Sequence, residues 1–246
     1  MVAAQSRRRD LTELGIGYAL ILLVIWTPRP AQRWLYLAAL AWIVFSSVRS
    51  FPGWSALGMR VKGLWPSLWV VVAAVAAAVA AVTVAGQQHT LRMPHTLAQW
   101  GAMFGGYAIW AMVQEYLLQG YFLLRLLRLL PKARWAALAA TGMFTLAHLP
   151  NPVLTGVTLV WGLVACTVFV RFRNLYPLAV AHAILGITVS ITIPQAALHH
   201  MRVGLGYYRY RPPAALQRSQ SDQTVSTVAW VTAEAATRRS ALQARP

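Results

Sequence analysis

The sequence predicts an all-α protein, a polytopic membrane helix bundle of about seven transmembrane helices. Of its 246 residues, 58% are hydrophobic and 11% are charged, and the mean hydropathy is +0.53. Soluble domains are roughly half apolar and a quarter charged, so this composition is typical of an integral membrane protein. Apolar runs approaching the ~20 residues that cross a bilayer also alternate with short links containing arginine, proline or glycine.

Seven apolar runs are expected to form the helices. The first follows three consecutive arginines, and we interpret it as an anchor helix rather than a signal peptide because Asp10 interrupts its flank. The fourth is longer than a membrane crossing requires. The fifth is stopped by Pro150 and Pro152, which disfavour helix at and before their positions. In chain order, the predicted runs are 14–26, 34–48, 65–85, 97–127, 135–149, 153–170 and 176–193.

The chain is expected to contain two regions. Residues 1–196 form the integral membrane helical domain, and the polar, basic residues 197–246 form a tail that we expect to be disordered. Arginine-rich links around 49–62, 125–134 and 171–173 favour a cytoplasmic N-terminus. We expect the cytoplasmic membrane of a prokaryote as the location. The formal net charge of +17 is attributed to inner-loop and lipid-facing arginines, with no nucleic acid as partner.

Glu115 is the centre of the functional interpretation. It is the only acidic residue between Glu13 and Asp222, and it lies within an apolar run. A charged side chain in a bilayer is costly unless it faces a bundle interior, a cavity or a partner, so it indicates a functional site. Measured from the nearest arginine-rich links, Glu115 lies ~15 to 20 Å deep, His148 ~21 Å and His182 ~14 Å. Three helices should therefore bring one carboxylate and two imidazoles to a similar depth.

Each of these residues also has a purely structural interpretation. Glu115 can be a polar contact between helices, His148 a helix-end histidine before a proline, and His182 a neutral core histidine bonded to a backbone carbonyl. Gln114 and Gln119 can join helices through their amides. Gln119, however, is four residues after Glu115, so it shares a helix face with that carboxylate and can orient it.

Three motifs in this region resemble those of the CPBP family, the CAAX-protease and bacteriocin-processing intramembrane proteases. The resemblance covers roughly residues 97–195 and implies a helical bundle in which a glutamate and histidines converge in a cavity. It also implies cleavage of peptide bonds in or near the bilayer, including those of lipidated CAAX termini. The motifs are Gln114-Glu115-x-x-x-Gln119-Gly120, Phe144-x-x-x-His148, and His182 followed by an apolar run.

The chain departs from the family pattern at three positions. The first motif of the family is usually Glu-Glu-x-x-x-Arg, whereas here Gln114 replaces the first acid and Gln119 replaces the arginine. The third motif usually has asparagine four residues after its histidine, and here that residue is Gly186. An amide or oxyanion donor is then missing. Gln119, Asn151 and Ser190 are the candidates to compensate for it.

Hydrolysis of an amide requires a base to activate water and donors to hold the oxyanion. We therefore predict an intramembrane endopeptidase of glutamic type, in which Glu115 activates water and His148 and His182 assist. The expected substrate is a membrane-anchored or lipidated, CAAX-like protein in the lipid bilayer, and no cofactor is expected. A metallo-type enzyme stays open, because zinc accepts the ligand types of these three residues. The other alternative, suggested by the three departures, is a catalytically inactive family member acting as a membrane scaffold or binding protein.

Overall fold

The computed structural model describes residues 2–94 and 96–211. The chain divides into two units, Met1–Arg209 and Tyr210–Pro246, and only the first two residues of the second unit are among those described. The fold below is therefore that of the first unit. Residues 212–246 of the predicted tail lie outside the described part of the chain.

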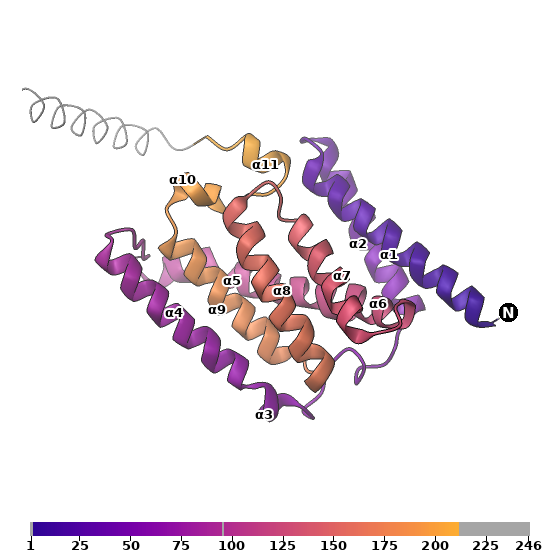
Figure 1. Ribbon diagram of the computed structural model, residues 1–246. Coiled ribbons are helices and arrows are strands. Elements are labelled where there is room, and N and C mark those ends of the chain that lie inside the picture. The colour runs from indigo at the N-terminus through magenta and orange to yellow at the C-terminus, as the bar shows by residue number, and fades with distance from the viewer. Residues whose placement is uncertain (1, 95, 212–246) are drawn as a thin grey trace, which may run out of the picture. The chain divides into compact units, whose positions relative to one another are not determined.

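All regular secondary structure of the described residues is helical, so the prediction of an all-α protein is confirmed (Figure 1). Most helices are α-helices, but η1 is a π-helix and η2 a single 3-10 turn. In chain order, the elements are α1 (Val2–Trp26), α2 (Ala31–Arg49), α3 (Leu64–Ser67), α4 (Trp69–Gln87), α5 (Leu97–Glu115), η1 (Tyr116–Leu123), α6 (Leu124–Leu129), α7 (Ala133–Leu146), α8 (Pro152–Phe172), α9 (Tyr176–Thr192), α10 (Gln195–Leu198), η2 (His199–Met201) and α11 (Leu205–Tyr208).

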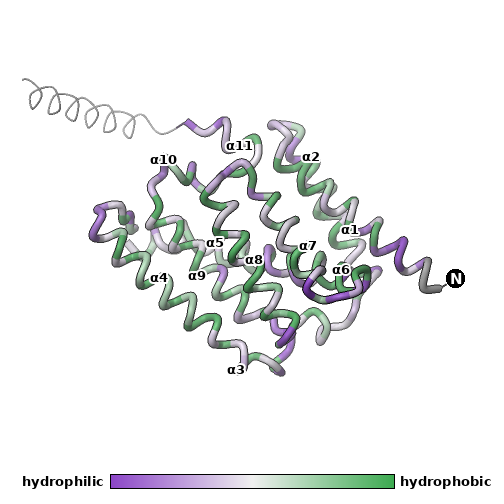
Figure 2. The backbone as a smooth tube through the Cα atoms, viewed as in Figure 1, coloured by the Kyte–Doolittle hydropathy of each residue, from purple (hydrophilic) through white to green (hydrophobic). Residues whose placement is uncertain are grey.

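Three helical segments among the described residues are long and apolar enough to cross a membrane. They are Ala31–Arg49, Leu64–Gln87 and Pro152–Phe172, and α9 is apolar but shorter. The predicted count of seven transmembrane helices is not confirmed, because only these three segments of the described residues combine the length and apolar character of a crossing. Of the remaining helices, α7 and α9 have 14 and 17 residues against the ~20 that a straight crossing requires. Figure 2 shows apolar residues along α4, α8 and α9, and hydrophilic residues at the start of α1 and the α6–α7 turn.

The helices pack as two groups joined by one long segment. α4, α9, α8 and α7 lie roughly side by side, while α1 and α2 pack on each other beyond α7 (Figure 1). The continuous segment α5–η1–α6 runs behind α9, α8 and α7 and contacts α9, α7 and α1. The main apolar core lies where η1 meets α7, α8 and α9, and it includes Leu118, Leu123, Phe169 and Leu178.

Local sequence signals fix where the helices that carry the site begin. α5 starts at a capping box in which the Thr96 hydroxyl accepts from the Gln99 amide and the Gln99 side chain accepts from the Thr96 amide. α8 starts at Asn151, whose side chain accepts from the Leu154 amide, followed by a proline in the first turn. α9 has Pro177 in its first turn. These signals set where the helices that carry Glu115 and its partners Trp161 and His182 begin.

Two ion pairs hold α1 against α6. The Arg125 guanidinium donates to the Glu13 carboxylate at 2.8 Å, with both side chains buried, and Arg128 donates to Asp10 at 2.7 Å. Both arginines were expected among the positive charges of a cytoplasmic link. In the structure they lie against α1, whose two acids pair with them.

The chain beyond residue 196 is ordered for a further dozen residues. It forms α10, η2 and α11, and the Gly204 amide donates to the Leu149 carbonyl at 2.7 Å. α11 also packs on α1. The structure therefore differs from the prediction of disorder starting at residue 197, since apolar contacts and backbone hydrogen bonds hold this segment against the bundle.

Candidate active site

Glu115 is a fully buried carboxylate with hydrogen-bond partners on both oxygens. It is the last residue of α5 and has 0% of its surface exposed. Its Oε1 lies 2.8 Å from His182 Nδ1 and accepts a hydrogen bond of 2.7 Å from Trp161 Nε1, while Oε2 accepts one of 3.2 Å from Gln119 Nε2. The cost of burying a charge is thus offset by polar partners from three helices.

A change in helix type directly follows Glu115. The π-helix η1 starts at Tyr116, and its end is marked by the Leu124 amide bonding to the Gln119 carbonyl five residues back. Short π-helical turns within α-helices are rare and frequently occur at functional sites. Here η1 contains Gln119, which is fully buried and directs its amide at the Glu115 carboxylate. The expectation that Gln119 shares the face of Glu115 is confirmed by this hydrogen bond.

His182 connects Glu115 to a cavity. Its ring is 7% exposed, is bound to Glu115 through Nδ1, and lines the large cavity of the bundle. Two aromatic rings hold it: the Trp161 ring lies at 5.8 Å and the Phe144 ring at 6.0 Å between centroids, the latter edge to face. Since Nδ1 is engaged by the carboxylate, Nε2 is the nitrogen left to act in the cavity.

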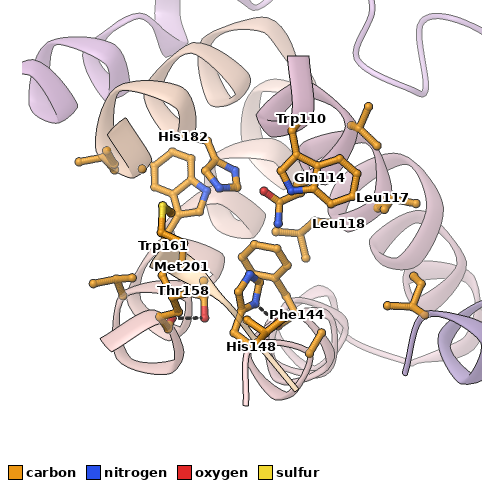
Figure 3. Close-up of a pocket in the computed structure, with 18 of the residues that line it drawn as sticks. Trp110, Gln114, Leu117, Leu118, Phe144, His148, Thr158, Trp161, His182 and Met201 are labelled. Carbon is orange, nitrogen blue, oxygen red and sulfur yellow. Dashed lines mark hydrogen bonds between the residues drawn. The ribbon is translucent and has the colours of Figure 1, made fainter. Parts of the chain in front are cut away.

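His148 lines the same cavity from the other side of Phe144. It lies two residues after α7, and its Nδ1 lies 2.7 Å from the Phe144 carbonyl. The rings of His148 and Phe144 are 4.8 Å apart and nearly perpendicular. Figure 3 shows His182, Phe144 and His148 around one space. The structure therefore brings both predicted histidines to one cavity, but only His182 contacts Glu115.

Gln114 and Glu115 face different surroundings although they are neighbours in sequence. Gln114 lines the cavity beside Trp110 and Leu118 (Figure 3), whereas Glu115 is not among the cavity-lining residues. Successive residues of a helix point about 100° apart, which places the amide in the cavity and the carboxylate behind His182. His182, which contacts Glu115 and lines the cavity, therefore connects the buried carboxylate to that cavity.

Two of the predicted supporting residues serve the fold rather than the cavity. Asn151 is fully buried, caps α8, and donates from Nδ2 to the Leu198 carbonyl at 2.8 Å and the Arg202 carbonyl at 3.1 Å. Ser190 lies on α9 outside the cavity lining, and its carbonyl accepts from Arg92. Neither residue supplies a donor to the site, because sequence distance from a histidine does not specify which way a side chain points.

Two residues of the site were missed by sequence reasoning. Trp161 was not considered as a site residue, but it is buried and donates to Glu115. Its central position in the apolar run 153–170 was the available signal. Tyr107 lines the cavity from α5, seven residues before Gln114 and hence on the same face of that helix as Gln114.

The cavity itself has a volume of about 1650 Å³. This exceeds the ~300 to 1,000 Å³ of common small-molecule pockets. Apolar side chains from α1, α2, α4, α5, η1, α7, α8 and α9 form most of its lining. A few polar groups interrupt this apolar lining, among them Tyr107, Gln114, His148, Thr158 and His182. A long apolar chain attached to a polar group matches this distribution.

The predicted zinc ligands do not form a metal-binding set. Within the described residues, no group of three or more His, Cys, Asp or Glu side chains is arranged to hold a metal ion. The Glu115 oxygens are taken by Trp161, His182 and Gln119, and His148 Nδ1 is bound to a backbone carbonyl. A catalytic zinc site needs three protein ligands converging at about 2.0 to 2.2 Å, and these groups are not arranged in that way.

The comparisons with known proteins agree with the motifs. Residues 96–188 match the family model described as Rce1-like, Type II CAAX prenyl endopeptidase Rce1-like. No curated protein and no solved structure matches the chain significantly. The matched segment runs from the start of α5 into α9, and so contains Glu115, His148 and His182. Residues 96–188 of this chain are therefore similar to the Rce1-like family, which is consistent with the resemblance of the three motifs to the CPBP family.

Proposed function

We propose that this protein is an intramembrane endopeptidase that hydrolyses a peptide bond in a membrane-anchored or lipidated, CAAX-like protein. The observation that carries the proposal is the Glu115–His182 pair, held at 2.8 Å with the imidazole lining a large apolar cavity. A histidine oriented by a buried carboxylate is a common general base in hydrolysis. The match to a family of CAAX prenyl endopeptidases supports the same substrate class.

In this proposal His182, rather than Glu115, takes the proton from water. The Glu115 carboxylate is enclosed by three donors at 2.7 to 3.2 Å and does not reach the cavity. With Nδ1–H donating to Glu115, the lone pair of Nε2 is free to accept a proton. Glu115 is then a positioning residue that fixes the tautomer of His182 and stabilises the imidazolium formed during the reaction.

The reaction follows the ordinary course of amide hydrolysis. The water oxygen bonds to the carbonyl carbon while His182 takes one water proton, and the electron pair of the C=O π bond moves to the carbonyl oxygen. When the C–N bond breaks, its electron pair goes to nitrogen, which takes a proton from the imidazolium. In this proposal His148, which lines the cavity beside Phe144, binds the polar end of the peptide. No step requires a metal ion.

Cleavage of a farnesylated CAAX-terminated peptide by the purified protein in liposomes tests the proposal. The variants His182→Ala and Glu115→Gln should lower kcat, with His182→Ala losing about 10²- to 10⁴-fold because a general base is removed. His148→Ala should lower activity less. Ser190→Ala is the matched control on α9, since Ser190 lies outside the cavity lining, and it should cleave normally. Undiminished turnover by folded His182→Ala would refute the assignment.

A second candidate function is supported by Gln114. The side chain that lines the cavity at this turn of α5 is an amide, whereas the neighbouring carboxylate is enclosed. A protein that binds lipidated peptides without cleaving them fits this arrangement. The variant Gln114→Glu separates the two functions. If the unaltered protein binds but does not cleave the peptide and Gln114→Glu cleaves it, the chain is a binding protein; if the unaltered protein cleaves it, the endopeptidase proposal stands.

A further inference from the structure

We propose that the Tyr107 hydroxyl is the hydrogen-bond donor that holds the oxyanion in this site, in the place left open by Gly186. The inference rests on the proposed endopeptidase function and deepens it by naming a further catalytic residue. Tyr107 lies on α5 and Gly186 on α9, two helices that pack against each other. Both residues line the cavity.

The close approach of Tyr107 to α9 depends on glycine at position 186. A Cβ atom placed on Gly186 would overlap the Tyr107 hydroxyl oxygen and its ring carbons Cζ and Cε1. Any other residue would force this ring aside. Glycine in a helix interior costs roughly 1 kcal/mol relative to alanine, so its presence here is explained by the tyrosine that lies on it.

The position of the hydroxyl relative to His182 suits a role in catalysis. Gly186 is four residues after His182, so the two share one face of α9 about one turn apart. The hydroxyl on Gly186 therefore lies one helical turn along from the imidazole, in the same cavity. A carbonyl bound between the two groups, with its carbon near His182 and its oxygen along α9, would therefore meet the Tyr107 hydroxyl.

The Tyr107 hydroxyl is also available to a substrate. It forms no hydrogen bond with any residue that the structure describes, although it interacts electrostatically with Glu115. The three donors considered from the sequence are directed elsewhere. Gln119 donates to Glu115, Asn151 donates to the Leu198 and Arg202 carbonyls, and Ser190 lies outside the cavity lining. Tyr107 therefore provides the donor on the α9 side of the cavity, and Gln114 provides an amide from α5.

In the proposed step, Tyr107 donates a hydrogen bond but transfers no proton. As water oxygen bonds to the carbonyl carbon and His182 takes the water proton, the π electron pair of the carbonyl moves to its oxygen. The O–H of Tyr107 stabilises the negative charge that develops there. The same hydrogen bond weakens again when the C–N bond breaks and the C=O bond is restored. Such a donor acts mainly in the transition state, and so affects kcat more than KM.

The variant Tyr107→Phe tests this role in the full-length protein in liposomes. It keeps the ring on Gly186 and removes only the hydroxyl. With the farnesylated peptide we expect kcat to fall by about 10²- to 10³-fold, as for removal of a single oxyanion donor, with KM nearly unchanged. A phosphonate analogue of the tetrahedral intermediate should bind more weakly by a similar factor, while the uncleaved peptide binds normally. Tyr176→Phe, an exposed tyrosine at the start of α9, is the matched control.

A second pair of variants tests the same role if Tyr107→Phe does not fold. Gly186→Ala should displace the Tyr107 ring and lower kcat, whereas Gly142→Ala, with open space around the added methyl, should not. Suppose that the unaltered protein cleaves the peptide and that folded Tyr107→Phe has the same kcat, whether or not its KM rises. This inference is then wrong, and the proposed function stands. If the unaltered protein does not cleave any lipidated peptide, both are wrong.

Discussion

At the scale of single residues, Trp161 contacts both Glu115 and His182. Its indole Nε1 donates to Glu115 Oε1 at 2.7 Å, the same oxygen that His182 contacts. Its ring also packs near the His182 imidazole. Trp161 therefore fixes both members of the proposed catalytic pair. A tryptophan in this position links the packing of α8 to the orientation of a side chain on α9.

The variant Trp161→Phe should lower both stability and activity. It removes the indole N–H and leaves a buried carboxylate oxygen with one donor fewer, which costs about 1 to 3 kcal/mol. Thermal unfolding in detergent measures this cost, and peptide cleavage should fall because His182 is less well oriented. The exposed Trp135 on α7 offers the matched control, Trp135→Phe, for which neither quantity should change. Equal stability of the two variants would show that the indole N–H contributes nothing to the site.

The residues of the site were predictable to different degrees. The rarity of acids in the apolar region identified Glu115, and counting residues from the arginine-rich links placed His182 at a similar depth. Which of Gln114 and Glu115 faces the cavity was not predictable, because the answer depends on the rotation of α5 about its axis. Tyr107 was missed because it becomes informative only once Gly186 is seen beneath it.

At the scale of helices, α1 is attached through buried charges to the segment that continues from Glu115. Arg125, on the helix that continues from Glu115 through η1, donates from Nε and Nη2 to Glu13 Oε2 and from Nη1 to the Tyr121 carbonyl. The Ser50 hydroxyl of the segment after α2 donates to the same carboxylate. One acid on α1 therefore connects three segments of the bundle.

The variant Arg125→Met should destabilise the protein strongly. Removing one partner of a buried ion pair leaves the Glu13 charge uncompensated, at a cost of about 3 to 5 kcal/mol. Replacing both partners, as in Glu13→Leu with Arg125→Met, should restore much of that loss because no buried charge is left. Denaturant or thermal unfolding in detergent compares the single and double variants. A double variant less stable than Arg125→Met would contradict this account of the α1–α6 contact.

Helix positions were largely predictable, since apolar runs bounded by proline, glycine and arginine correspond to α1, α2, α4, α5, α7, α8 and α9. The π-helix η1 was not. A π-helix forms when tertiary contacts favour backbone hydrogen bonds between residues five apart rather than four apart. The sequence of Tyr116–Leu123 carries no distinct signal for this change. The polar network of α1 with α6 was also missed, because charges near a helix end resemble ordinary loop charges.

At the scale of the whole molecule, the size and lining of the cavity indicate which class of substrate the fold can bind. Helices from both groups of the bundle contribute to its lining, so no single hairpin forms it. Its size and apolar surface exceed what a peptide bond alone requires. A lipid chain of a substrate would fill the apolar part while the peptide lies at Tyr107, His148 and His182. Affinity should then come mainly from the lipid, since each buried CH₂ contributes about 0.8 kcal/mol.

A bulky residue on the cavity wall away from the catalytic pair should therefore change selectivity for lipid length without changing the chemistry. Ala77 on α4 lines the cavity and takes no part in the hydrogen bonds of Glu115. For Ala77→Trp we expect KM to rise at least about 10-fold for a geranylgeranylated peptide and less for a farnesylated one, because the longer chain loses more buried CH₂ groups, while kcat stays constant. The neighbouring Ala76, which is exposed and outside the cavity lining, gives the control Ala76→Trp. Equal effects on both lipids would show that the cavity does not hold the lipid chain.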